Sequence, residues 1–223
     1  VLRGRSWCSW ATTCAKFANE HYGAHIGNTR QHTIPGGVDL RRFTLQEERE
    51  PGYNVAWVGR LWIAKNVFGA LQVFNQLLQF DAGNPWHLWL RGDKYHPPHW
   101  WRRHVESYVE ANPRLQGRVT FTPRADDMNR WYEGKDFLLQ TSYKEVFSYV
   151  VGEAAAKGIK PVVQMTTGAD AIWPGEWVFQ THADAVRMLM EGRGDPAGYR
   201  QSLVDRGYTL SDRVARWNEV LGL

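Results

Sequence analysis

The sequence has few cysteines and no long apolar run. Cys8 and Cys14 are its only cysteines, which fits a reducing compartment and excludes a disulfide-rich scaffold. We expect two free, buried thiols, with a bridge between them as the alternative. No run of about eighteen apolar residues occurs, so no helix should span a membrane. The first residues lack the apolar core of a signal peptide, and the chain begins with Val. We therefore expect a domain of a longer, cytoplasmic protein.

Strong charge is also lacking: the net charge is +4, and Lys and Arg are spread along the chain. Nucleic-acid binders usually cluster these residues on one face, so we expect no nucleic-acid partner. A mildly basic surface suits a phosphorylated small molecule or, in peripheral association, the anionic inner face of a membrane. The hydrophobic fraction of 43% is enough for one good-sized core or two small ones.

Short apolar runs alternate with segments of helical periodicity, which predicts an α/β fold with a Rossmann-like, doubly wound parallel sheet. The predicted strands are residues 53–59, 86–92, 118–122, 136–140, 160–165 and 177–180. The predicted helices are residues 66–80, 99–110, 126–132, 149–157, 183–191, 197–206 and 211–221. Before them, we expect a helix over residues 7–22 and a short strand with a Pro-Gly-Gly turn over residues 32–40.

Ligands of such sheets lie at the carboxyl ends of the strands, where the strand order reverses. With the order 3-2-1-4-5-6, taken by analogy, that crevice lies between the loop of residues 59–66 and the loop of residues 141–153. Gly59 lets the backbone approach a ligand, and Arg60 and Lys65 offer cations that bind phosphate. A helix that begins near Ser148 adds free N–H groups. These features predict a diphosphate site, with ordinary surface cations as the alternative.

Two glutamates, Glu145 and Glu153, stand in the second loop and its helix with seven residues between them. Carboxylates accept hydrogen bonds from paired hydroxyls, so we expect both to line one crevice and hold a ligand with a sugar at each end. The interpretation as a glycosidase acid–base pair is less favoured, because the nearby cations and the helix dipole should keep both carboxylates ionised. Solvated acids near a helix start are the third interpretation.

Three segments resemble the C-terminal, donor-binding domain of retaining GT-B glycosyltransferases of family 4. IPGGVDLRRF (residues 34–43) is similar to that family's I-P-N-G-V-D-x-x-x-F segment. VGRLWIAKN (58–66) resembles V-G-R-L-x-x-x-K-[GN], and EVFSYVVGEAAAKGIKPVV (145–163) resembles E-x7-E followed by A-x-G-x-P-V-V. The resemblance runs from about residue 9 to the end. It implies that residues 1–30 are a helix and linker from an N-terminal acceptor domain, and residues 31–223 a nucleotide-sugar donor-binding domain.

The resemblance also implies roles for single residues. Arg60 and Lys65 would contact the donor diphosphate, and Glu145 the hydroxyls of the transferred sugar, as the catalytic set. Glu153 would hold the ribose diol, and the loop after Phe121 would lie by the base. The backbone that meets the donor would come from Gly59, Phe147, Ser148, Tyr149 and Val150. The donor would be a UDP or GDP sugar, transferred with retention and with neither a cofactor nor an obligatory metal.

The sequence departs from the family pattern in three places. Val146 and Ser148 replace two glycines of E-G-F-G, Gly36 replaces Asn, and one extra residue precedes Pro161. The acceptor, a glycan or a lipid-linked sugar, would bind through the N-terminal domain. A sugar-nucleotide epimerase or hydrolase of the same fold is an alternative. A non-catalytic nucleotide- or partner-binding module is another, favoured if Val146 and Ser148 close the pocket.

Two segments have a metal-like pattern: HPPH (residues 96–99) with His104, and the pair Asp126-Asp127, which a helix N-terminus explains. No carboxylate or cysteine completes a ligand set with the histidines, so we expect no metal site.

Overall fold

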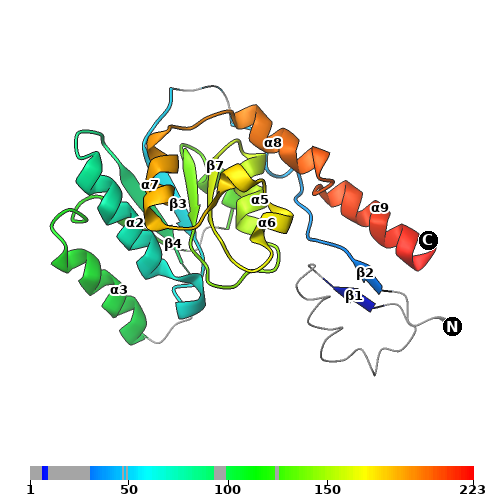
Figure 1. The fold of residues 1–223 in the computed structure, drawn as a ribbon, viewed down its shortest axis with the longest axis horizontal. Helices are drawn as coiled ribbons and strands as arrows, with labels where there is room; N and C mark the ends of the chain where they lie inside the picture. Colours follow the sequence, from blue (N-terminus) through cyan, green and yellow to red (C-terminus); the bar gives the residue numbers. More distant parts are fainter. Residues whose placement is uncertain (1–6, 10–30, 47, 49, 93–98, 124–125) are drawn as a thin grey trace.

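A six-stranded parallel sheet forms the centre of the molecule (Figure 1). The structure is a computed structural model that describes residues 7–9, 31–46, 48, 50–92, 99–123 and 126–223. The strands are β3 (Asn54–Val58), β4 (His87–Arg91), β5 (Val119–Thr122), β6 (Phe137–Gln140), β7 (Lys160–Gln164) and β8 (Val178–Phe179). All six predicted strands are confirmed to within two residues at either end.

The order of the strands places a topological switch between β3 and β6. The sheet runs β5-β4-β3-β6-β7-β8, which is the expected order 3-2-1-4-5-6 counted from β3. Val55 of β3 lies opposite Phe137 of β6, so the two strands end side by side. Because the chain leaves β3 toward β4 and returns at β6 on the other side, loops diverge at this point and leave room for a ligand.

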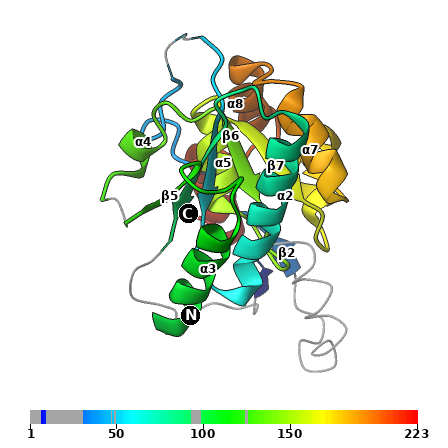
Figure 2. The same ribbon diagram turned by 90° about the vertical axis from the view of Figure 1, so that its left-hand side faces the viewer.

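Helices cover both faces of the sheet (Figures 1 and 2). On one face α2 (Val67–Phe80), α3 (His99–Ala111) and α7 (His182–Met190) pack over Val55 and Trp57. On the other, α5 (Tyr149–Ala156) and α8 (Pro196–Asp205) pack over Ala56 and Leu138. Successive side chains of a strand point to opposite faces, so the central strands β3, β6 and β7 contribute to both cores, which explains their nearly continuous apolar sequence. The outer strand β4 buries only alternate residues, Leu88 and Leu90.

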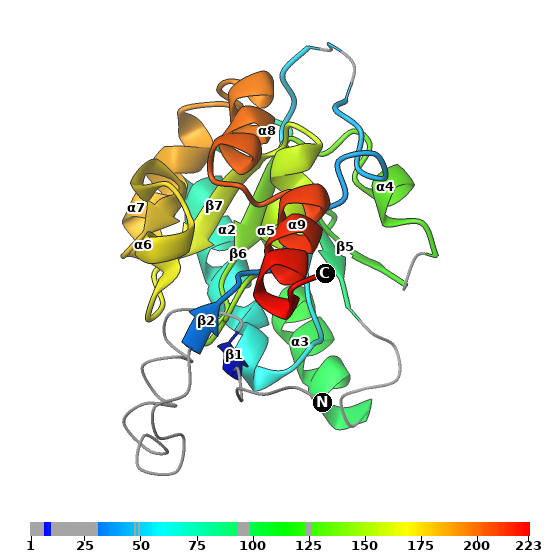
Figure 3. The same ribbon diagram turned by 90° about the vertical axis from the view of Figure 1, so that its right-hand side faces the viewer.

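The remaining elements are short, apart from the last helix. They are β1 (Trp7–Ser9), β2 (Gln31–Thr33), η1 (Ile63–Lys65), α4 (Met128–Trp131), α6 (Ala169–Ile172), η2 (Gly175–Trp177) and α9 (Leu210–Leu221). Figure 3 shows α9 and the β1–β2 pair at the same end of the molecule. Arg200 of α8 donates to the carbonyl oxygens of Leu40, Phe43 and Ala156 and so holds the segment before the sheet against α5.

Two predictions for the beginning of the chain are corrected. The helix predicted over residues 7–22 is wrong at its start, because Trp7–Ser9 form β1 and pair in parallel with Gln31–Thr33. Residues 10–22, and Cys14 with them, lie outside the described residues. The strand predicted over residues 32–40 ends at Thr33, and Val38 forms a single bridge to Thr209. Three-residue strands are too short to carry a readable period, and their partners are distant in sequence.

In the part of the chain that the structure describes, no helix is both long and apolar enough to cross a bilayer.

Candidate functional site

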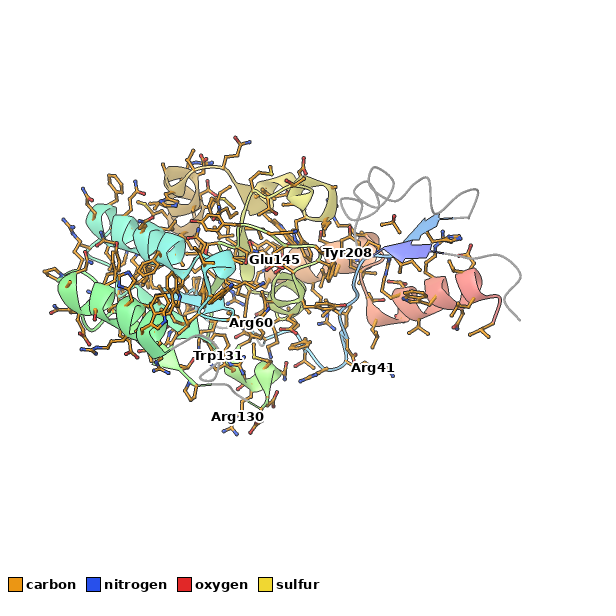
Figure 4. All side chains as sticks on the ribbon, turned by 90° about the horizontal axis from the view of Figure 1, so that it is seen from below. Arg41, Arg60, Arg130, Trp131, Glu145 and Tyr208 are labelled. Atoms are coloured by element: carbon orange, nitrogen blue, oxygen red, sulfur yellow. The ribbon has the colours of Figure 1, made fainter. Side chains whose placement is uncertain are left out.

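The two loops that the sequence singles out leave neighbouring strands at the same edge of the sheet. The first connects β3 to α2 through η1, and the second connects β6 to α5. Figure 4 looks onto this edge and shows Arg60 of the first loop and Glu145 of the second on the same face. Parallel strands end together, so the predicted crevice between strands one and four is at the switch between β3 and β6.

Hydrogen bonds tie the two loops to each other. The Thr141 hydroxyl donates to the carbonyl oxygen of Asn66 at 2.8 Å and accepts from Trp57 Nε1 at 3.1 Å. The backbone N–H of Tyr143 donates to the Ala64 carbonyl at 2.9 Å. Asn66 adopts a left-handed conformation with φ of 49°, which Asn tolerates, and its side chain caps α2 by accepting from Gly69 N–H. The β3 loop is therefore held in one shape against the β6 loop.

Lys65 and Glu145 form an ion pair across these two loops. Lys65 Nζ donates to Glu145 Oε1, and the Ser142 hydroxyl donates to the same oxygen at 2.9 Å. The two charged side chains are 26% and 19% exposed, so the pair is reachable from solvent yet oriented. The sequence assigns Lys65 and Glu145 to different parts of a donor, whereas the structure brings them into direct contact. Arg60 is exposed on the same face (Figure 4).

The second loop ends at the N-terminus of α5, where helical N–H groups have no intrahelical partner. The Phe147 ring is buried and packs against Trp173 and Tyr208 at centroid distances of 5.1 and 5.5 Å. Its side chain is therefore part of the core, and only its backbone can serve a ligand. Tyr149 is exposed and Val150 half-buried. These N–H groups and the helix dipole make the end of α5 suitable for an anion.

Glu153 lies one turn further along α5, and its contacts differ from those of Glu145. The Tyr132 hydroxyl donates to Glu153 Oε2 at 3.3 Å. Burial raises the pKa of Glu153 to about 7, against the lowering effect of the Tyr132 hydrogen bond and of Arg42 and Arg91. The cations lower this pKa as expected, but desolvation outweighs them, so Glu153 is only partly ionised near neutral pH. That both glutamates line one crevice stays a prediction.

Sequence reasoning missed two residues near this edge, Arg91 and Tyr132. Arg91 ends β4, the neighbour of β3, and its guanidinium lies over the Trp131 ring at 5.7 Å. The rule that found Arg60 and Lys65, a cation just after a buried strand, would also have found Arg91. No local pattern signals Tyr132, because it follows a four-residue helix, and only the tertiary structure places it at Glu153.

One departure from the family pattern, Gly36, has a clear structural reason. A Cβ atom at Gly36 would lie 2.4 Å from Cδ1 of Phe147, so a glycine makes room for that ring. Ser148 is 4% exposed, and Val146 is partly buried against the core that covers the α5 face of the sheet. Neither Val146 nor Ser148, the two residues that replace glycine, therefore has a side chain fully exposed to solvent.

Among the residues that the structure describes, no three His, Cys, Asp or Glu side chains gather as metal ligands. His104 packs against Phe68 and Trp101, at ring distances of 5.3 and 6.1 Å. His96 lies outside the described residues, as do residues 124 and 125 of the loop after β5.

Solved structures show the same fold. A glycosyltransferase from Rickettsia africae has a TM-score of 0.81 at 15% identity, over 98% of this chain and 63% of that one. The pneumococcal O-GlcNAc transferase GtfA, in complex with UDP and GlcNAc, has a TM-score of 0.76 at 13% identity, over 97% of this chain and 44% of that one. The chain thus spans less than two thirds of either protein.

A C-terminal domain also matches along its whole length. The C-terminal domain of the glycosyl transferase group 1 family protein LpcC from Francisella tularensis has a TM-score of 0.63 at 22% identity. The match covers 78% of this chain and 100% of that domain. The fold is accordingly the Rossmann-like α/β fold of GT-B glycosyltransferases.

No curated protein sequence matches the chain. The sequence profile of the family described as glycosyl transferases group 1, however, matches residues 52–202, which is more than half of the chain and includes both site loops. By sequence as well as by fold, the chain belongs to the glycosyl transferases group 1 family.

Proposed function

We propose that the chain is the donor-binding domain of a retaining, metal-independent glycosyltransferase. It would hold a nucleoside-diphosphate sugar, with UDP or GDP as the nucleotide, for transfer to a glycan or a lipid-linked acceptor. One observation carries the proposal. The switch between β3 and β6 holds the Lys65–Glu145 pair beside the N-terminus of α5, in a chain whose family transfers sugars.

The diphosphate would bind between the two loops. Lys65 and Arg60 supply positive charge from the β3 loop, and the N–H groups at the start of α5 supply donors from the other. A Cβ atom at Gly59 would lie 3.2 Å from the Trp57 ring and 3.4 Å from Lys65 Cγ, so the glycine leaves space beside both side chains. During transfer, negative charge develops on the leaving diphosphate, and fixed cations and N–H groups stabilise that charge without rearranging.

The two glutamates would hold the two sugars of the donor. Glu145 is oriented by Lys65 and Ser142 through one oxygen, Oε1, which leaves Oε2 for a hydroxyl of the transferred sugar. Glu153 would accept from the ribose diol. Its raised pKa means that this role depends on pH, because protonation turns one carboxylate oxygen into a hydrogen-bond donor and removes the charge that strengthens the acceptor.

The acceptor site would lie in a second domain, in line with the greater length of the first two solved relatives. The UDP and GlcNAc bound to the pneumococcal transferase support a donor of the nucleoside-diphosphate type. Peripheral association with the inner face of a membrane and a cytoplasmic location stay predictions.

Calorimetric titration of the chain with UDP, GDP, ADP, UDP-glucose and GDP-mannose tests the proposal. We expect one nucleotide series to bind, and Glu153→Ala to weaken it by about tenfold through loss of the ribose contact. Glu110→Gln, an exposed acid on α3, serves as the control. If the folded protein binds none of these nucleotides, the proposed donor site is refuted and only the resemblance in fold remains. Unchanged affinity in Glu153→Ala would refute the ribose assignment.

A further inference from the structure

Two buried polar atoms near the candidate site make no hydrogen bond with any residue that the structure describes. They are Oε1 of Gln140 and Oγ of Ser148, on side chains that are only 5% and 4% exposed. Buried polar atoms in native proteins are nearly always paired. Two such atoms together, at the end of β6 and the start of α5, therefore call for a partner beyond the residues that the structure describes.

Both residues line one small pocket at the carboxyl edge of the sheet, and Glu145 lines it with them. The rest of its wall is largely apolar and includes Val163, Ile172 and Trp173. The volume open to the centre of a water molecule is about 10 Å³, which is room for about one water-sized group. The pocket therefore fits one hydroxyl of a ligand, but no larger substituent.

The position of Ser148 makes its unpaired hydroxyl informative. Ser148 is the N-cap of α5, and a serine there normally accepts a hydrogen bond from an N–H of the first turn. Its side chain makes no such bond and lies in the pocket instead. The hydroxyl stays available to a ligand at the positive end of an eight-residue helix.

We propose that Gln140 and Ser148 bind a hydroxyl group of the transferred sugar, next to Glu145; this rests on the proposed function. A hydroxyl both donates and accepts, so it can pair with the amide of Gln140 in either orientation and with the Ser148 hydroxyl at once. A sugar without a hydroxyl at that position leaves both atoms unpaired. Sites built in this way reject the deoxy analogue strongly, which makes the two residues determinants of sugar specificity.

The experiment compares the nucleotide alone with the nucleotide sugar. Calorimetry on UDP, GDP, UDP-glucose and GDP-mannose yields, for the nucleotide that binds, the ratio of the Kd of the diphosphate to the Kd of the sugar donor. This ratio isolates the contribution of the sugar from that of the nucleotide. We expect Ser148→Ala and Gln140→Leu each to lower the ratio about tenfold. Ser148→Ala keeps the backbone N–H that would meet the diphosphate, so its effect should fall on the sugar donor.

The controls repeat the same chemical changes away from the pocket. Gln72→Leu on the exposed face of α2 and Ser202→Ala on α8 should leave the ratio unchanged. If Gln140→Leu does not fold, Ser148→Ala alone decides, since it removes a single oxygen.

The possible outcomes separate this inference from the proposed function. Intact diphosphate binding with an unchanged ratio in Ser148→Ala overturns this inference and leaves the donor site standing; the pocket then holds only water. Failure of the unaltered protein to bind any of the four nucleotides overturns the proposed function and this inference together.

Discussion

The Tyr132 hydroxyl donates a hydrogen bond to Glu153 Oε2 across 3.3 Å, and the phenol that carries it is completely buried. Tyr132 follows α4, whereas Glu153 belongs to α5. Burial raises the pKa of both groups, that of Tyr132 well above its usual value and that of Glu153 to about 7. Near neutral pH a large share of Glu153 is therefore protonated, and the candidate ribose ligand is also a titrating group.

Glu153→Gln should stabilise the protein at alkaline pH. The pKa of Glu153 is about 7 when folded, against a reference value of 4.5, so the folded state binds more protons between these two pH values. The free energy of unfolding therefore falls as pH rises through this window, by roughly 3 kcal/mol. The variant loses this dependence. Urea unfolding at pH 5 and pH 8 measures it, with Glu110→Gln as the control. An identical pH slope in Glu153→Gln and the unaltered protein would contradict the assignment.

Tyr132→Phe should move the same titration to higher pH. The hydrogen bond from Tyr132 lowers the pKa of Glu153, whereas burial raises it. Without the hydrogen bond, the pKa should therefore rise further. We expect the midpoint of the pH dependence of stability to rise above that of the unaltered protein. The same shift should appear in nucleotide affinity, because the ionised carboxylate is the proposed ribose acceptor. A midpoint that falls or stays constant would show that the hydroxyl does not act on Glu153.

Thr141→Val should loosen the two site loops. The substitution keeps the shape of the side chain but leaves Trp57 Nε1 and the Asn66 carbonyl without their buried partner. We expect a loss of about 2 kcal/mol in the free energy of unfolding, with weaker nucleotide binding. Thr141→Ser keeps the hydroxyl and is the matched control. Equal stability of the Val and Ser variants would disprove the role of the hydroxyl.

Gly36→Asn should destabilise the protein, although Asn is the usual residue at that position in the family 4 pattern that the sequence resembles. Its Cβ would lie 2.4 Å from the Phe147 ring, which is buried against Trp173 and Tyr208 and cannot move freely. We expect a cost of about 1–3 kcal/mol, typical of an overpacked core. Gly83→Asn is the control, since nothing lies within 4 Å of that position. Thermal unfolding of both variants measures the difference, and similar melting temperatures would contradict the prediction.

Lys65→Met and Glu145→Gln should impair binding far more than folding. Both side chains are partly exposed, and such ion pairs contribute about 0–1 kcal/mol to stability. If Lys65 binds the diphosphate, its loss should weaken UDP or GDP by about tenfold or more. Glu145→Gln should instead weaken the sugar donor relative to the diphosphate. Calorimetry on both ligands separates the two effects, and a uniform loss in both variants would argue against separate roles.

Much of the fold follows from local patterns in the sequence. Apolar runs such as residues 136–140 and helical spacings such as residues 66–80 mark β6 and α2 within one residue of their observed bounds. The loops of the candidate site follow from the same patterns, since the carboxyl ends of parallel strands share an edge. The β1–β2 pair was missed, because each strand is three residues long and its partner lies more than twenty residues away.

The sequence by itself determined the strands and helices of the parallel sheet and the two loops, because these depend on residues that are neighbours along the chain. The strand order was taken by analogy with doubly wound sheets, and the structure confirms it. Only the tertiary structure decided that Lys65 contacts Glu145, that Tyr132 contacts Glu153 and that Gly36 makes room for Phe147. The raised pKa of Glu153 was likewise decided only by the tertiary structure. Burial and contact depend on which residues meet through space, and a charge responds to the solvent removed around it rather than to its sequence neighbours.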